Sequence, residues 1–262
     1  MTALVDTNVY VGLWPFRRLP IESSADLVAR LKSRGVTQAW AGTFEGLLHR
    51  DLAGANARLV ETCQRHGAGL LAPFGSVNPA LPDWEEDLRR CHEVHKMSGI
   101  RLHPNYHGYK LDDPRAARLL ELAADRGLLV QLVVSMEDER TQHSLVRVPH
   151  VDCAPLAGLM KQHARLRLVV LNAFRALSPQ QAADVVDAAS RRVAFDIALL
   201  EGVGAVARLV DKLGLEHVVF GSLAPLFYFE SAKLKLRESE LAGAQIEAIT
   251  AANAARLLAN PT

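Results

Sequence analysis

Short apolar runs rich in branched residues alternate with amphipathic stretches along the whole chain. The short runs predict strands, and the stretches whose apolar residues recur every three or four positions predict helices. We expect eight strands, near Leu4–Asp6, Gln38–Gly42, Leu70–Gly75, Ile100–His103, Leu129–Val134, Leu168–Leu171, Val193–Asp196 and Val218–Gly221. We expect helices between and after them, at Asp26–Ser33, Leu52–Gln64, Trp84–His95, Pro114–Asp125, Ala154–His163, Pro179–Ala189, Val203–Lys212 and about Ala242–Leu258.

Regular alternation of strand and helix predicts parallel pairing, and eight such units fit a closed (β/α)₈ TIM barrel. An open, doubly wound sheet is the alternative, but no Gly-x-Gly-x-x-Gly follows the first strand. The sequence has no linker rich in Pro, Gly or Ser and no low-complexity segment. We therefore expect residues 1–262 to form a single domain.

The fourth predicted strand has polar residues on one of its two faces. Alternation places Ile100 and Leu102 on one face and Arg101 and His103 on the other, and Pro104 should end the strand and begin a loop. Such a strand suits the wall of a polar cavity, or a strand end whose polar groups are satisfied by neighbouring loops. The sequence alone leaves both interpretations open.

In a TIM barrel the active site lies where the strands end. That rule directs attention to polar residues at the predicted strand ends, because these side chains should converge on one rim. They are Asp6, Asn8 and Tyr10 on strand one, Arg101 and His103 on strand four, Gln131 and Ser135 on strand five, Asn172 on strand six, Asp196 on strand seven and Ser222 on strand eight.

Charge and composition narrow the classes of partner. The formal net charge is +1, which gives no electrostatic reason to expect nucleic acid or an anionic membrane surface. No apolar run approaches a bilayer span, and the start of the chain lacks a signal-peptide pattern. The three cysteines are scattered singly, as is typical of a cytoplasmic protein without disulfides or a thiolate metal site.

Three short motifs resemble those of the amidohydrolase superfamily, in the branch that contains decarboxylases and lactonases. They are Leu4–Gly12, which has the frame of an opening strand ending in His-x-His, then Gly221–Pro225, which has the frame of Gly-Ser-Asp-x-Pro, and the closing helix around Asn253–Leu258. The resemblance runs nearly end to end. It implies a TIM barrel in which a bound metal activates water.

The metal-binding residues of that superfamily are absent from the matching positions. The His-x-His positions hold Asn8 and Tyr10, the strand-six histidine position holds Asn172, and the strand-eight aspartate position holds Leu223. The strand-five position falls in 133–135, which contains no histidine. Asn, Tyr and Leu are poor ligands for zinc and similar ions. We therefore expect no metal and no other cofactor.

Three functions are compatible with this pattern. The favoured one is a metal-independent hydrolase or lyase acting on a small molecule that bears a carboxylate, ester or lactone. A metal-independent pyrone dicarboxylate lactonase exists in the superfamily, although it relies on a last-strand aspartate that is missing here. The second is a non-catalytic binding or regulatory protein. The third is a metal hydrolase with relocated ligands, for which the candidates are His103, His107, Asp138 and His143.

In the favoured hypothesis His103 is the general acid or base and Asp138 orients it, while Arg101 holds an anionic or carbonyl oxygen. Asn172 and Tyr10 donate hydrogen bonds where charge develops. A small molecule is the expected partner, and formation of a homo-oligomer is left open. Further substrate-binding candidates are Asn8, Arg17, His107, Arg140, His143, Ser222 and Tyr228. Arg17 reads equally well as a surface residue, and the aromatic run 226–231 as a lid, a dimer contact or packing.

Overall fold

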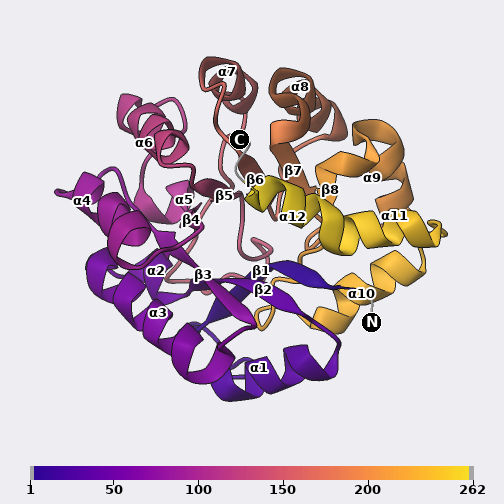
Figure 1. The fold of residues 1–262 in the computed structure, drawn as a ribbon, viewed down its shortest axis with the longest axis horizontal. Helices are drawn as coiled ribbons and strands as arrows, with labels where there is room; N and C mark the ends of the chain where they lie inside the picture. The colour runs from indigo at the N-terminus through magenta and orange to yellow at the C-terminus, as the bar shows by residue number, and fades with distance from the viewer. Residues whose placement is uncertain (1–2, 260–262) are drawn as a thin grey trace.

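The structure is a computed structural model that describes residues 3–259. Its eight strands are all parallel and follow one another in the order β1 to β8 around a barrel (Figure 1). Each predicted strand is present, and the TIM barrel is confirmed. The strands are β1 Val5–Val11, β2 Gln38–Thr43, β3 Leu71–Ser76, β4 Gly99–Leu102, β5 Leu129–Val133, β6 Leu168–Leu171, β7 Val193–Asp196 and β8 Val218–Val219.

The last strand meets the first one and closes the barrel. Although β8 has only two residues, the chain beyond it continues alongside β1. Thr7 donates its backbone N–H to the carbonyl of Phe220 at 3.0 Å, and Tyr10 donates to the carbonyl of Ala224 at 2.9 Å. Val9 and Ala224 form a parallel bridge. These contacts place the ends of β1 and β8 side by side, where the superfamily motifs lie.

Helices surround the barrel, and Figure 1 shows them as an outer ring. They are α1 Ser24–Ser33, α2 Glu45–Leu48, α3 Leu52–Gly67, α4 Trp84–Arg89, α5 Pro104–His107, α6 Pro114–Asp125, α7 Leu156–Gln162, α8 Pro179–Ala189, α9 Ala205–Leu213, α10 Phe229–Arg237, α11 Gly243–Glu247 and α12 Asn253–Leu258. Two π-helical segments, Arg90–Val94 and Ala248–Ala252, continue α4 and join α11 to α12. Within residues 3–259, none of these helices has the length and apolar character needed to cross a membrane.

Two of the helices correct expectations from the sequence. Pro104 begins the short helix α5 instead of a loop, because a proline at the first helical position gives up no hydrogen bond. The segment 226–231 leads directly into α10, in which Phe229, Ala232 and Leu236 are buried at a spacing of three and four residues. Packing is therefore the role that the structure shows for Phe229.

Two apolar layers follow from the alternation along each strand. Ile100 and Leu102 of β4 belong to the layer between the strands and the helices. Tyr10, Trp40 and Phe74 belong to a second layer inside the barrel. Arg101 lies between Ile100 and Leu102 in sequence and is fully buried. The predicted separation of the two faces of β4 is confirmed.

Candidate active site at the strand ends

An irregularity in β1 sets the geometry of the strand ends. Asp6 pairs with Ala39 and Val9 with Ala41, so β1 advances three residues while β2 advances two. Such a bulge redirects side chains. Here the carboxylate of Asp6 accepts the backbone N–H of Asn8 at 3.1 Å. At the bulge, a backbone N–H of β1 is therefore bonded to a side chain of the same strand instead of to a neighbouring strand.

Asp6 also joins β1 to the chain that follows β8. Its two oxygens accept the backbone N–H of Ser222 at 3.0 Å and the Ser222 hydroxyl at 2.5 Å. The carboxyl group is fully buried. Burial raises the pKa of Asp6 to about 7, even though these hydrogen bonds favour the charged form. Ser222, predicted to bind substrate, is therefore engaged by Asp6.

A second buried carboxyl, on Asp196 of β7, completes a network with two asparagines. Asn8 donates through Nδ2 to Oδ1 of Asn172 at 2.8 Å and to Oδ2 of Asp196 at 2.7 Å. Asp196 also accepts the backbone N–H of Asn172 at 2.8 Å. Burial raises the pKa of Asp196 to about 6. The network joins the ends of β1, β6 and β7.

Asn172 has little freedom left to bind anything else. Its side-chain N–H donates to the carbonyl of Ser135 at 2.8 Å, and its Oδ1 accepts from Asn8. Its φ of +59° lies in the left-handed region, which asparagine tolerates better than most residues. The structure thus brings Asn8 and Asn172 together, as the strand-end rule predicts, and has them bind each other.

Tyr10 and His103 form the second part of the site, across the barrel interior. The Tyr10 hydroxyl lies 2.9 Å from Nε2 of His103, and neither residue is exposed. Burial raises the pKa of Tyr10 to about 12, so the phenol keeps its proton. Burial, with the charges of His107 and Arg101, lowers the pKa of His103 well below its ordinary value. A neutral imidazole that accepts from Tyr10 at Nε2 carries its proton on Nδ1.

The Nδ1 of His103 is buried and has no hydrogen-bond partner among residues 3–259. The ring of His107 packs against that of His103 with centroids 5.7 Å apart, and its Nε2 lies 2.8 Å from the carbonyl oxygen of Gly46. Buried polar atoms in native proteins are nearly always paired, and each exception calls for an explanation, such as a catalytic role or a bound water or ion. The Nδ1 of His107 is also unpaired, but it is an acceptor when Nε2 donates to Gly46, so of the two histidines His103 has the unused N–H.

Arg101 serves the barrel itself. Its Nε donates to Oε1 of Gln131 at 2.7 Å, and its terminal nitrogens donate to the carbonyls of Val9, Trp40 and Thr7 at 2.8, 2.9 and 3.3 Å. The guanidinium also lies 4.5 Å from the centre of the Tyr10 ring. Binding a substrate oxygen, the role expected from the sequence, would require Arg101 to give up contacts that hold β1, β2 and β5 together.

The loop after β5 lies apart from this cluster. Asp138 forms ion pairs with Arg140 at 2.5 Å and Arg175 at 3.1 Å. The hydrogen bonds from Arg140 lower the pKa of Asp138. No contact between Asp138 and His103 appears within residues 3–259, so the expected orienting role has no support in this conformation. His143 is exposed, with its ring 6.0 Å from that of Phe16.

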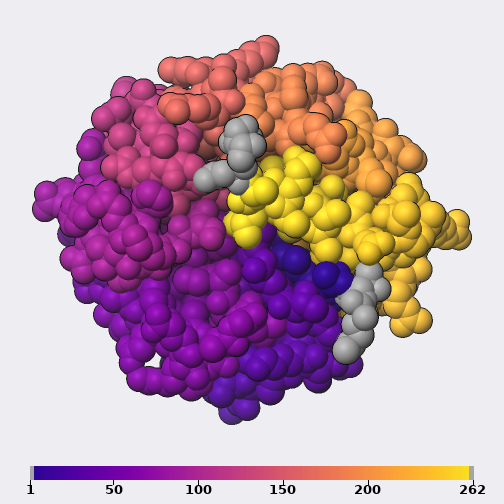
Figure 2. All heavy atoms as spheres, viewed as in Figure 1, coloured from indigo at the N-terminus to yellow at the C-terminus, as the bar shows by residue number. Residues whose placement is uncertain are grey.

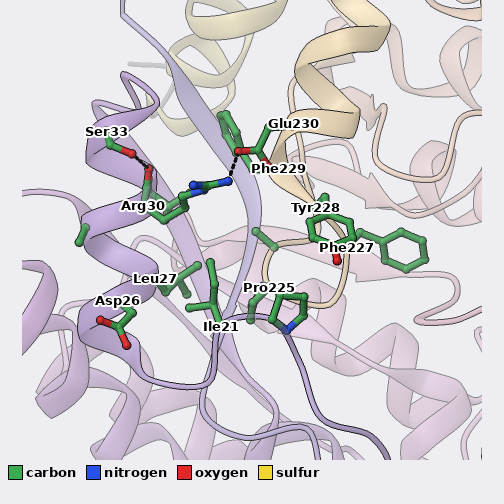
Figure 3. A pocket seen from close by; sticks show the side chains of 14 residues that line it. Ile21, Asp26, Leu27, Arg30, Ser33, Pro225, Phe227, Tyr228, Phe229 and Glu230 are labelled. Carbon is green, nitrogen blue, oxygen red and sulfur yellow. Dashed lines mark hydrogen bonds and ion pairs between the residues drawn. The ribbon is translucent and has the colours of Figure 1, made fainter.

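Two further candidates lie near the loops after β1 and β8. Arg17 pairs with Glu137 at 3.0 Å and donates to the carbonyl of Leu226 at 3.0 Å, so it joins the loops after β1, β5 and β8. Tyr228 is 65% exposed. It lines a groove of about 490 Å³ between α1 and α10, outside the barrel, where Arg30 and Glu230 pair across the gap (Figure 3).

Apolar side chains fill the mouth of the barrel above the polar network. The exposed fraction of Asn8, Tyr10, His103, Asn172 and Asp196 is 0%. The buried residues that belong to the interior apolar cluster and lie beyond the strand ends are Trp14, Leu19, Phe44, Leu47, Met136, Ala198, Leu199, Leu223 and Leu226. In this conformation solvent does not reach the Tyr10–His103 pair.

The residues at the superfamily's metal positions do not fit a metal ion. Leu223 is apolar and fully buried, and the amides of Asn8 and Asn172 bind each other. Tyr10 is bound to His103. Among residues 3–259 no group of three or more His, Cys, Asp or Glu side chains is placed to hold a metal. His103 and His107 are adjacent, but the other relocated-site candidates, Asp138 and His143, do not join them. We derive no step through a metal.

The sequence predicted the position of two residues of the network, Asp6 and Asp196, but not a function for them. Asp6 and Asp196 are strand-end carboxyls expected on the rim, and the structure gives both a raised pKa. Parallel topology could have placed them together. Their full burial, which gives them that pKa, depends on side chains from several loops and could not be read from spacing.

Comparison with known proteins settles the family. The model of the amidohydrolase family matches residues 15–259. The chain belongs to the amidohydrolase family. No curated protein matches the sequence. The resemblance inferred from the three sequence motifs is therefore confirmed, and two of these motifs, Gly221–Pro225 and the closing helix, lie within the matched residues.

Solved structures share the fold at low sequence identity. A 5-carboxyvanillate decarboxylase from Sphingomonas paucimobilis superimposes with a TM-score of 0.79 at 16% identity, covering 98% of this chain and 99% of that one. A 2,6-dihydroxybenzoate decarboxylase from Rhizobium gives 0.71 at 13%, with 98% of each chain covered. A dihydroxybenzoic acid decarboxylase from Polaromonas sp. JS666, solved with bound manganese, gives 0.76 at 11%, covering 98% and 97%. At these identities the likeness establishes the fold alone.

Proposed function

We propose that this amidohydrolase-family member is a metal-independent hydrolase or lyase acting on a small molecule that bears a carboxylate, ester or lactone. One observation carries the proposal. The neutral imidazole of His103 is held by Tyr10 at 2.9 Å and has a buried Nδ1 that pairs with no group among the described residues. A polar atom left unpaired in a buried site is costly, and a ligand that accepts a hydrogen bond from it would remove that cost.

The chemistry follows from the protonation states. His103 stays neutral, so its Nδ1–H acts as a hydrogen-bond donor that polarises a substrate carbonyl or carboxylate oxygen. This replaces the general acid or base role expected from the sequence. Proton transfer near neutral pH falls to Asp196, because its pKa of about 6 lies close to working pH. The charge of Asp196 also raises the pKa of Tyr10, which supports placing the two groups in one site.

Access to this site needs the loops at the mouth to separate. Trp14 of the loop after β1 and Leu226 of the loop after β8 are both buried above the pair. Arg17 joins those loops through the Leu226 carbonyl. Loops of this kind commonly open and close over the site in TIM-barrel enzymes. Substrate entry is therefore proposed to break the Arg17 contact.

The test is a turnover screen of small aromatic carboxylates, lactones and esters with EDTA present. Variants of the protein are then assayed with any compound that is turned over. His103→Gln should reduce turnover by about a hundredfold to a thousandfold, the usual cost of losing such a donor. The matched control is His66→Gln, on the exposed surface of α3, which should keep full turnover. Circular dichroism verifies the fold. Full turnover in a folded His103→Gln protein would remove His103 from the reaction.

A non-catalytic binding protein is the second candidate, and the filled mouth favours it. In that case Tyr10 and His103 are part of the packed interior, and the turnover screen finds no substrate. His103→Gln would then change only the stability of the protein. The two functions are thus separated by whether any compound in the screen is turned over above the rate of the His103→Gln variant.

A further inference from the structure

Arginines surround a depression at the end of the barrel opposite to the proposed active site. It measures about 670 Å³ and is bounded by the residues before β5, β6 and β7 and by α12. In Figure 1, α12 lies across this end of the barrel, and Figure 2 shows its yellow atoms against the pink and orange segments. The charged lining residues are Asp125, Arg126, Arg165, Arg167, Arg191, Arg192 and Arg256.

Part of this arginine cluster has a structural task. Arg192 donates to the carbonyls of Met160, His163 and Leu166, where α7 ends and β6 approaches. Arg256 of α12 donates to the carbonyl of Glu216 at 2.6 Å. Cations at the carboxyl ends of helices satisfy free carbonyls and suit the helix dipole. These contacts engage the terminal guanidinium nitrogens of Arg192 and Arg256.

The outer arginines of the cluster retain donors that face the depression. Arg191 is exposed, and its side chain has no hydrogen bond or ion pair within residues 3–259. Arg126 uses one N–H, on the carbonyl of Leu122 at 3.2 Å. The side chain of Arg165 is 74% exposed and pairs with Asp125. The depression thus has donors of Arg126 and Arg191 available at its rim, and Arg165 lies there in an exposed ion pair with Asp125.

Positive charge is concentrated at this depression, although the chain as a whole is nearly neutral. The whole chain has a formal net charge of +1, yet among residues 3–259 six arginines and one carboxylate line this depression. Guanidinium groups do not lose their protons in proteins, so the mutual repulsion persists at every working pH. Burial and the charge of Arg191 lower the pKa of Arg256, as expected where positive groups crowd together. A bound anion would relieve this repulsion.

We propose that this depression is a binding site for a small polyanion that carries phosphate or clustered carboxylate groups. The planar fork of arginine matches both groups with paired hydrogen bonds. The volume lies within the range of small-molecule sites, about 300–1,000 Å³. Nucleic acid is disfavoured because the formal net charge of the chain is only +1.

A ligand bound in this depression would stabilise the folded protein. This effect is independent of the proposed reaction. The ligand would connect α12 to the loops before β5, β6 and β7. Because it binds the folded chain and not the unfolded one, it would raise the midpoint of thermal unfolding with increasing ligand concentration. No residue of the arginine cluster belongs to the Tyr10–His103 site, so the two proposals stand or fall separately.

The test is titration calorimetry with inorganic pyrophosphate and, in a separate arm, with citrate, at constant ionic strength in chloride buffer. The two arms distinguish a phosphate ligand from a polycarboxylate. The double variant Arg165→Gln/Arg191→Gln changes two exposed side chains and should weaken binding by about tenfold or more. The matched control is Arg89→Gln/Arg115→Gln, exposed arginines of α4 and α6 outside the depression, which should bind like the unaltered protein.

Saturable binding of either anion that is lost in the cluster variant and kept in the control supports the site. The absence of saturable heat with both anions, at concentrations up to the millimolar range, overturns it. Equal affinity in the two double variants also overturns it, because attraction to general positive charge would then explain the binding. Thermal unfolding of the two variants without ligand checks that both are folded.

Discussion

Two carboxyl groups, of Asp6 and Asp196, are buried where β1, β6, β7 and β8 end. Each accepts backbone and side-chain hydrogen bonds, and each still has a pKa raised by burial, to about 7 and about 6. Desolvation therefore exceeds the stabilisation that the hydrogen bonds give to the charged form. At the scale of single residues, ionisation of these two carboxyl groups lowers the stability of the folded protein as pH rises.

Asp6→Asn should remove part of this loss of stability. The Asp6 carboxyl titrates near 3.8 when unfolded and near 7 when folded. Between these values the folded state holds the extra proton, so the free energy of unfolding falls as pH rises through this window and stays lowered above it. Asparagine does not ionise and keeps an acceptor for the N–H groups of Asn8 and Ser222. The variant should therefore gain stability relative to the unaltered protein as pH rises.

The expected gain is on the order of a few kcal/mol at most between about pH 5 and about pH 8. Urea unfolding across that range, with both proteins in the same buffers, measures it. Stability curves that run parallel at all pH values would show that Asp6 has the same proton affinity folded and unfolded.

Arg101 is predicted to be a stabilising residue. Arg101→Met removes donors to Val9, Trp40 and Gln131 and leaves these buried acceptors unpaired. Loss of one partner from a buried charged network costs about 3–5 kcal/mol. Chemical denaturation should show a loss of that size. Arg18→Met is the control, because the Arg18 side chain is 87% exposed and its removal should change stability by less than about 0.5 kcal/mol. Similar midpoints for both variants would contradict this role.

Among the helices, α8 offers the clearest test of a sequence feature. Ser178 accepts the backbone N–H of Gln181 at 3.2 Å, and Gln181 returns a bond to the Ser178 N–H at 3.0 Å. Ser178→Ala should cost about 1 kcal/mol because the backbone N–H of Gln181 at the helix start loses the hydroxyl that caps it. Ser178→Asp retains an acceptor and should be close to neutral. Thermal unfolding of both proteins makes the comparison, and equal losses would show that the cap is not the cause.

Elements with strong local patterns were predictable. β6 and β7 have the bounds expected from their apolar runs, and α6 and α8 begin at the Pro that follows an N-cap residue. The helix α10 was not predicted, because its apolar residues are few among charged and polar ones and its start lies in an aromatic run. The short helices α2 and α5 have four residues each, too few to show a period.

The candidate site was predictable only in outline. Strand alternation turns Tyr10 of β1 and His103 after β4 towards the barrel interior, where they meet although 93 positions separate them in the sequence. The position of Asp138 was not accessible in the same way. It lies in the long connection between β5 and α7, which contains no helix or strand, so neither period nor register fixes where its side chain points. The ion pairs of Asp138 with Arg140 and Arg175 depend on the tertiary structure.

At the scale of the molecule, the superfamily's metal centre requires ligands from several strands at once. Here the positions on β1, β6 and the β8 end are filled by groups that bind one another or are apolar. We therefore predict that protein purified without chelator contains far less than one transition-metal ion per chain, by mass spectrometry of the metals. EDTA should leave the unfolding temperature unchanged. Near-stoichiometric zinc, manganese or iron that survives dialysis would contradict this and favour relocated ligands.

The joining of β1 to the end of β8 also determines the order in which the chain can fold during synthesis. The bonds between Asp6 and Ser222 span 216 positions. During synthesis β1 leaves the ribosome before β8 and waits for it, and until then the sheet has two unpaired edges. Such open edges pair readily with other chains, and contacts of long sequence separation form slowly. The period before ring closure is therefore when the nascent barrel depends most on chaperones.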